Sequence, residues 1–303
     1  MTSFRKTGLA LLAAICLTAA LGISESLPGA AGTEQVRVES RHKPILTVDG
    51  LQFRDLNANG VLDPYEDWRL SPEERTKDLL SQMTLAEKLA QMHHPTFIPN
   101  KDGTPPKFLE SWVRDKALGF ILVRDLPSAR AAAECMNQLQ EWSEQSRLGI
   151  PIVISMDSVH GLSYVNGATV FPHNLGLAAT RDLELIERVA QIAAEEHRAV
   201  GVRMTLSPNA DLATEPRWGR VMECPGEDAD FAAKYVEIFV RAYQNGTSLN
   251  PESVITCVKH FPGAGPQMDG VDFAPIVSTR ETLDYHLKPF KAAIEAGAAS
   301  IMP

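Results

Sequence analysis

A lysine and a histidine stand side by side at the end of an apolar segment, where they could bind a polar ligand. Residues 254–258 form a continuous run rich in β-branched side chains, which is typical of a strand buried in a parallel sheet. Lys259 and His260 follow this run, and a Pro-Gly-Ala-Gly-Pro segment comes soon after them. In α/β folds the carboxyl ends of the strands form the ligand-binding side. The pair is therefore a candidate for binding hydroxyl groups or an anion, although a strand that ends in a solvated lysine would give the same pattern.

Two other predicted strands lead into polar side chains of complementary chemistry. The run 151–156 is followed by Asp157 and His160, and the run 202–207 leads into a loop that contains Arg220. A carboxylate among guanidinium and ammonium donors suits a neutral polyhydroxylated ligand, because each hydroxyl both donates and accepts. Taken singly, Asp157 could instead cap a helix, and His160 could orient a loop.

Strands and helices alternate along most of the chain. The apolar runs predict five strands, at 118–123, 151–156, 202–207, 254–258 and 299–302. Amphipathic segments with capping residues predict helices at 73–83, 85–92, 128–146, 182–199, 228–245 and 280–296. Repeated βα units predict an α/β fold with a parallel sheet and outer helices. His197 lies in the middle of a predicted helix, and we expect it at the surface.

An acidic and amide-rich segment, 55–66, has the ligand pattern of a calcium loop. Gly60 allows the sharp turn that such a loop needs. The predicted ligands are Asp55, Asn57, Asn59, Val61, Asp63 and Glu66. Pro44 and the Asp49-Gly50 turn argue against a preceding helix, so a complete EF-hand is not predicted. The alternative is a turn whose Asn and Asp side chains cap its own backbone.

Composition and the N-terminal segment indicate the location of the protein and the classes of partner it can have. The 303 residues carry a formal net charge of −9 and no basic block, which disfavours nucleic-acid and anionic-membrane partners. Arg5-Lys6 before the apolar run 8–22 predicts a signal peptide, and hence a secreted or periplasmic protein with no membrane association after cleavage. A retained anchor is disfavoured by the shortness of the run. Three cysteines would remain, which is no disulfide framework.

Three motifs, in this order, resemble the N-terminal barrel domain of glycoside hydrolase family 3, of the β-glucosidase type. They are Asp-Ser-Val-His-Gly at 157–161, the Pro-Arg-Trp-Gly-Arg block at 216–223 and Lys-His-Phe-Pro-Gly at 259–263. The segment 171–180 is similar as well, and the resemblance covers 71–303. It implies an incomplete (β/α)8 TIM-type barrel with about five βα units. The expected organisation is a signal peptide at 1–31, a lead-in with the calcium-like loop at 32–70 and the barrel domain at 71–303.

The resemblance also implies a reaction and a set of binding residues. The family reaction is retaining hydrolysis, here of terminal non-reducing β-D-glucosyl residues of a β-glucoside or β-glucan oligosaccharide, without a catalytic cofactor. Asp157 would bind the outer hydroxyls of the sugar, Arg220 and His160 would bind substrate, and Lys259 with His260 would hold the face nearer the anomeric carbon.

The catalytic residues of the family have no match in this sequence. The nucleophilic aspartate of the family lies on the strand after the one predicted at 299–302, and its acid/base partner comes from a following domain. We therefore expect both beyond Pro303 and expect this chain alone to be an inactive fragment. The alternative is a non-catalytic sugar-binding protein. A β-xylosidase is a further alternative, and a β-N-acetylhexosaminidase is disfavoured because Ala264 stands where that branch has a histidine.

Overall fold

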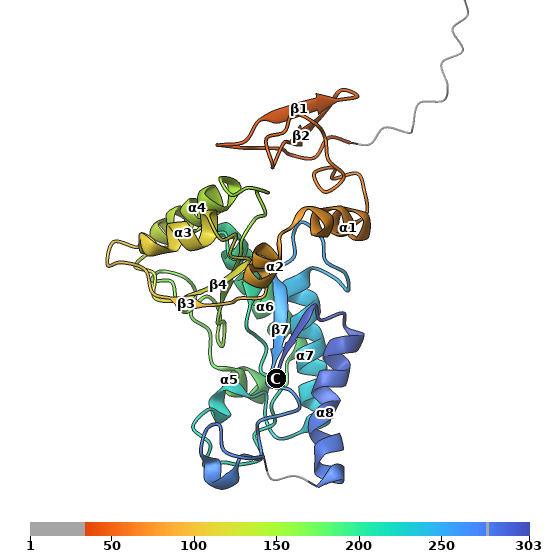
Figure 1. Cartoon of the computed structure of the whole chain (residues 1–303). Coiled ribbons are helices and arrows are strands. Elements are labelled where there is room, and N and C mark those ends of the chain that lie inside the picture. The colour runs from red at the N-terminus through yellow and green to blue at the C-terminus, as the bar shows by residue number, and fades with distance from the viewer. Residues whose placement is uncertain (1–33, 277–278) are drawn as a thin grey trace, which may run out of the picture. The chain divides into compact units, whose positions relative to one another are not determined.

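Six parallel strands form the central sheet of the computed structural model, which describes residues 34–276 and 279–303. The sheet order follows the chain order, from β3 to β8 (Figure 1). The strands are β3 (Thr96–Phe97), β4 (Phe120–Val123), β5 (Val153–Met156), β6 (Met204–Thr205), β7 (Ile255–Lys259) and β8 (Ser300–Met302). Every neighbouring pair is parallel, and among the described residues β3 and β8 do not pair with each other. The predicted α/β class and incomplete (β/α)8 barrel are confirmed, with β3 as an additional strand.

Long helices connect successive strands and cover the sheet. They are α4 (Ala129–Glu144), α6 (Leu183–Ala199), α7 (Ala229–Gln244) and α8 (Arg280–Glu295), and each lies within about two residues of its predicted range. The side-chain oxygens of Ser128, Asp182, Asp228 and Thr279 accept N–H groups of the first turns of these helices. These local signals explain why the helix starts are readable from sequence.

Shorter elements complete the described chain. They are α1 (Pro72–Gln82), α2 (Leu85–Gln91), α3 (Phe108–Arg114), α5 (Asn174–Ala179) and the 3-10 turns η1 (Val221–Glu223) and η2 (Met268–Gly270). An antiparallel hairpin, β1 (Ile45–Val48) and β2 (Leu51–Arg54), precedes them. Its turn residues Asp49 and Gly50 both have positive φ, 52° and 79°, which is the geometry of a tight hairpin.

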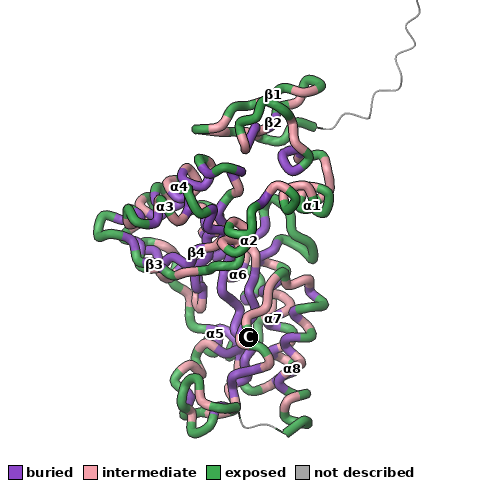
Figure 2. Tube along the Cα trace, viewed as in Figure 1, coloured by how far each residue is buried: buried purple, intermediate pink, exposed green. Residues whose placement is uncertain are grey.

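The core lies between the sheet and the helix sides that face it, where buried residues concentrate (Figure 2). Ile121 and Ile154 pack with Leu139 of α4, and Val258 packs with Phe290 of α8. The lead-in packs on the same compact unit, Arg37–Pro303, through contacts of Tyr65 with Met83 and Leu148. Apolar burial therefore holds the helices against the sheet, and this packing fixes the positions of the strand ends.

The expectation that His197 is exposed is wrong. His197 is fully buried, its Nδ1 lies 2.6 Å from the carbonyl oxygen of Ala193, and its Nε2 is hydrogen-bonded to Ser158. Burial lowers the pKa of His197 to about 4. The ring also packs edge-on against Tyr243 of α7, so the helix buries a side that its sequence pattern left polar.

Other expectations concern the cysteines and the membrane. Cys135, Cys224 and Cys257 are buried free thiols. Within residues 34–276 and 279–303, no helix has the length and apolar character needed to cross a bilayer. The predicted signal peptide lies outside the described residues.

Candidate functional site

The ends of β4, β5 and β7 bring a carboxylate between two cations. Lys259 is the last residue of β7, and its Nζ donates to Oδ1 of Asp157, which follows β5, at 2.8 Å. Arg124, which follows β4, donates from Nε to Oδ2 of Asp157 at 3.1 Å, and its Nη2 bonds to the same oxygen. The side chains of Lys259 and Asp157 are only 6% and 7% exposed. The predicted convergence of Asp157 and Lys259 is therefore present, while Arg124 was not predicted.

The charge of Asp157 is fixed by its two cationic partners. Burial alone would raise the pKa of Asp157, but Lys259 and Arg124 outweigh burial and hold the pKa below its usual value. Asp157 is therefore ionised at neutral pH, and its two oxygens serve only as acceptors. Arg124 also lies over the ring of Tyr164, at 5.6 Å from the ring centroid, which restricts its side chain.

A second group of side chains surrounds His260. Its Nδ1 lies 2.8 Å from Oδ2 of Asp211, and its Nε2 lies 3.4 Å from Nη1 of Arg220. Glu223 accepts two hydrogen bonds from Arg220, at 3.0 Å and 2.7 Å, and a third from Nδ2 of Asn209 at 2.9 Å. The predicted pair of His260 and Arg220 is thus in contact, and three residues without a predicted role hold it.

All three carboxylates of these two groups are engaged. Asp157 is bound to two cations, Asp211 to the His260 region and Glu223 to Arg220. By contrast, Oδ1 of Asn209 is buried without a hydrogen-bond partner among the described residues. Such an arrangement offers fixed donors and acceptors to a polar ligand, and it leaves none of these carboxylates free to act as a nucleophile.

The structure places His160 apart from this network. Its ring packs against that of His173, with centroids 4.2 Å apart, and its Nδ1 is buried without a partner among the described residues. Burial, with the neighbouring His173, lowers the pKa of His160. A substrate-binding role for His160 stays a prediction. Arg217, to which no role was assigned, pairs with Glu215 at 2.8 Å.

The calcium-like loop has two buried carboxylates that bind its own backbone. Asp55 accepts the N–H groups of Asn59 at 3.0 Å and Gly60 at 2.8 Å, and Glu66 accepts that of Leu56 at 2.7 Å. Burial is the main cause that raises the pKa of Glu66. These contacts match the self-capped turn that we gave as the alternative.

The other predicted calcium ligands lie close together. Asp63 accepts the side-chain amides of Asn57 at 2.6 Å and Asn59 at 2.8 Å, and the N–H of Val61 bonds to Asn59 at 2.8 Å. Within the part of the chain that the structure describes, no group of three or more His, Cys, Asp and Glu side chains is arranged to hold a metal. Calcium binding by this loop stays a prediction.

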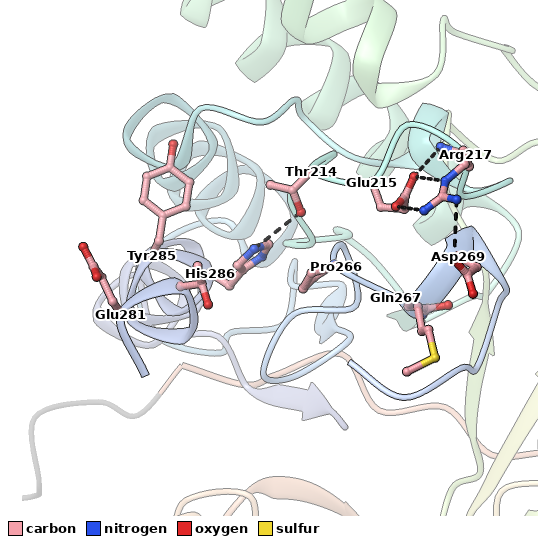
Figure 3. A pocket seen from close by; sticks show the side chains of 11 residues that line it. Thr214, Glu215, Arg217, Pro266, Gln267, Asp269, Glu281, Tyr285 and His286 are labelled. Carbon is pink, nitrogen blue, oxygen red and sulfur yellow. Dashed lines mark hydrogen bonds and ion pairs between the residues drawn. The ribbon is translucent and has the colours of Figure 1, made fainter. Parts of the chain in front are cut away.

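A separate cavity of about 650 Å³ lies beside the network. Figure 3 shows Arg217 bonded to both Glu215 and Asp269 on one side of it, and Tyr285 and His286 of α8 on the other. Its lining includes none of the four predicted residues at the strand ends, which are Asp157, Arg220, Lys259 and His260. The candidate site is therefore the network of paired side chains rather than this cavity.

The motifs at these strand ends match a known family. Residues 84–303 match the family model described as "Glycosyl hydrolase family 3 N terminal domain". The chain belongs to glycosyl hydrolase family 3. This confirms the resemblance carried by the three motifs, and it places all four residues of the network that were predicted from sequence inside the matched region.

Family 3 relatives are longer than this chain. A periplasmic beta-glucosidase/beta-xylosidase of Dickeya chrysanthemi is 41% identical in an alignment of 299 positions that covers 91% of this chain and 45% of the relative. Beta-glucosidase C of Emericella nidulans is 39% identical, covering 82% of this chain and 43% of the relative. The chain thus spans less than half the length of these two curated relatives.

Solved family 3 structures share the fold. The exo-1,3/1,4-beta-glucanase of a Pseudoalteromonas species has a TM-score of 0.68 at 29% identity, covering 80% of this chain and 31% of that one. A beta-glucosidase of Listeria innocua has a TM-score of 0.65 at 33% identity, covering 77% and 32%.

Proposed function

We propose that this chain forms the sugar-binding wall of a glycosidase site that acts on terminal non-reducing β-D-glucosyl residues. The observation that supports it most is the buried pair of Lys259 and Asp157, joined by Arg124 at the end of the adjacent strand. Taking such a pair out of water costs several kcal/mol per ion, so its position at three strand ends favours a role in binding.

The charges of the network favour a neutral ligand. The three cations Lys259, Arg124 and Arg220 are matched by the three carboxylates Asp157, Asp211 and Glu223. A balanced network attracts neither an anion nor a cation strongly, whereas sugar hydroxyls can bond to both kinds of group. This argument also fits the alternative of a non-catalytic sugar-binding protein.

The bond-breaking step requires further groups. Retaining hydrolysis needs one carboxylate as nucleophile and a second acid to protonate the leaving oxygen. Since each carboxylate of the network is engaged, we propose that both come from residues outside it. No residue of the sequence matches either catalytic role of the family, so we expect the 303-residue chain alone to bind the sugar without cleaving it.

The choice of glucose over other sugars rests on the relatives. The names of the Dickeya and Emericella relatives include beta-glucosidase, and one Listeria innocua structure is a complex with glucose and another with laminaribiose. Xylose is the main competitor, because the Dickeya relative is also named a beta-xylosidase. A β-N-acetylglucosaminidase of Paenibacillus has a similar fold, with a TM-score of 0.65 at 28% identity.

Calorimetric titration of the chain with glucose, xylose and N-acetylglucosamine tests the proposal. We expect glucose to bind most tightly and Lys259→Met to weaken it at least tenfold, about 1.4 kcal/mol, because a charged donor is lost. Lys77→Met, which removes an exposed lysine of α1, is the matched control and should bind like the parent. No binding of any of the three sugars would contradict the proposal. Turnover of an aryl β-glucoside by this chain would contradict the assignment of the catalytic groups.

A further inference from the structure

A buried aspartate after β6 bonds to three N–H groups of the loop that follows β7. Oδ1 of Asp211 accepts the backbone N–H of His260 at 3.1 Å and that of Ala264 at 2.7 Å, and Oδ2 lies 2.8 Å from Nδ1 of His260. Asp211 is fully buried. One carboxylate thus satisfies donors at both ends of a tight loop, which fixes the loop as a unit.

Packing around this loop leaves it little freedom to move. A Cβ at Gly265 would lie 1.8 Å from the carbonyl oxygen of Leu212. A Cβ at Gly263 would lie 3.1 Å from Cβ of His286, and Gly263 has a φ of +123°. These glycines are required for the loop to lie against the chain segment that contains Asp211 and against α8.

The hydrogen bonds of His260 define its tautomer. An ionised carboxylate only accepts, so the bond to Asp211 requires a proton on Nδ1. On the other side, Nη1 of Arg220 lies 3.4 Å from Nε2, and a guanidinium only donates. Nε2 must then carry a lone pair, and His260 is the neutral imidazole protonated at Nδ1.

We infer that Asp211 is a positioning residue, which holds His260 in the tautomer whose Nε2 carries the lone pair to which a sugar hydroxyl donates. Arg220 faces this lone pair at 3.4 Å, longer than an ordinary hydrogen bond, and the hydroxyl takes its place when the sugar binds. The inference deepens the proposed function and rests on it for the identity of the ligand. Lys259, the residue before His260, donates only, so the two neighbours give the site one donor and one acceptor. A hydroxyl group that donates to His260 can at the same time accept from a cation, which is the pairing that favours sugars over ligands without hydroxyl hydrogens.

Asp211→Asn changes the chemistry while keeping the shape. The amide oxygen of asparagine can still accept the two backbone N–H groups, and its NH2 group then faces Nδ1 of His260. Because an NH2 group only donates, Nδ1 must accept, and the proton moves to Nε2. The substitution therefore reverses the tautomer and places an N–H of His260 against the N–H of Arg220.

Nitrogen-15 NMR of the histidine side chains in the full chain measures this directly, with the His260 signal assigned from its loss in His260→Gln. We expect the parent chain to be protonated at Nδ1 and Asp211→Asn at Nε2, with at least tenfold weaker glucose binding by calorimetry. Asp272→Asn is the control, because Asp272 accepts from Trp218 Nε1 at 2.9 Å and an amide oxygen can do the same. It should leave both the tautomer and the affinity unchanged.

The outcomes separate this inference from the proposed function. A folded Asp211→Asn chain that keeps the proton on Nδ1, or binds glucose within twofold of the parent, overturns the inference. If that variant does not fold, the parent spectrum decides, since a parent protonated at Nε2 also overturns it. If the parent binds no sugar, the proposed function fails, while the tautomers still report whether Asp211 positions His260.

Discussion

At the scale of single residues, the ionised pair of Lys259 and Asp157 is expensive to break. Removing one partner of a buried ion pair leaves an uncompensated charge, which typically costs about 3–5 kcal/mol. Here Arg124 also bonds to Asp157, so the carboxylate keeps one cation when Lys259 is removed, whereas Lys259 has no second carboxylate among its described ion pairs. Loss of Asp157 is therefore expected to be more harmful to folding than loss of Lys259.

The pH dependence of stability should report this asymmetry. The folded-state pKa of Asp157 lies below its usual value of about 3.9, so its ionic contribution is complete above about pH 4 and is lost as the pH falls through the lowered pKa. We expect Asp157→Asn to destabilise the chain by about 2–4 kcal/mol at pH 7, and the difference from the parent to shrink below about pH 4. Urea unfolding at several pH values measures it.

A neutral substitution provides the comparison for this experiment. Asn137→Ala removes an exposed uncharged side chain of α4, so its effect on the free energy of unfolding should not vary with pH. A difference between Asp157→Asn and the parent that is the same at pH 3 and pH 7 would show that the carboxylate is not held ionised by its partners.

Two of the candidate binding residues predicted from sequence directly follow a recognisable strand. Asp157 and Lys259 stand there, and Arg124 follows the predicted strand 118–123 in the same way, so the same rule could have found it. Asp211 and Glu223 could not be assigned a role. Asp211 bonds to His260, which only the fold brings close, whereas Glu223 pairs with Arg220 three residues before it. A carboxylate in a loop has no periodic signature, so neither contact showed in the sequence pattern.

At the scale of elements, the loop 55–66 buries two carboxylates, and the nearby Lys43 balances only one of the two negative charges. Asp55 and Glu66 are 1% and 4% exposed, and their acceptor oxygens bind backbone N–H groups rather than cations. Burial of this carboxylate is also the main cause that raises the pKa of Glu66. A calcium ion would supply the missing positive charge with the oxygen ligands it prefers.

We propose that this loop binds calcium, and thermal unfolding in calcium and in EDTA tests it. Calcium at 100 times its Kd would stabilise the chain by about 2.7 kcal/mol and raise the melting temperature by several degrees. Glu66→Gln should lose this shift, because an amide is a poorer calcium ligand than a bidentate carboxylate. Asp102→Asn, an exposed acidic residue of another turn, should keep it. If the parent melts at the same temperature in calcium and in EDTA, the loop does not bind calcium and is only a self-capped turn.

Element prediction succeeded where local signals were strong and failed where they were short. The capped amphipathic helices α4, α6, α7 and α8 were all predicted, since each has a capping residue and a periodic apolar side. The strand β3 has two residues and α5 has six, which is too short for periodicity to show. Tertiary contacts, and not local sequence, define these two elements.

At the scale of the whole molecule, the compact unit begins a few residues after the predicted signal peptide, 1–31. Residues Arg37–Pro303 form one compact unit, and any cleavage between about residues 20 and 31 would leave that unit intact. The three cysteines of the unit are buried free thiols. Two relatives, from Dickeya chrysanthemi and Salmonella typhimurium, are named periplasmic beta-glucosidases.

Export is therefore the prediction that belongs to the molecule as a whole. We propose that the chain, produced in a Gram-negative host, is recovered from the periplasm with a new N-terminus between about residues 21 and 32, because the basic and apolar segments direct secretion. Replacing both Arg5 and Lys6 with glutamate should leave the precursor uncleaved in the cytoplasm, whereas Arg41→Glu, a charge reversal in the compact unit, should not. Intact precursor in the membrane fraction would instead identify the apolar run as a retained anchor, and uncleaved parent protein in the cytoplasm would contradict export.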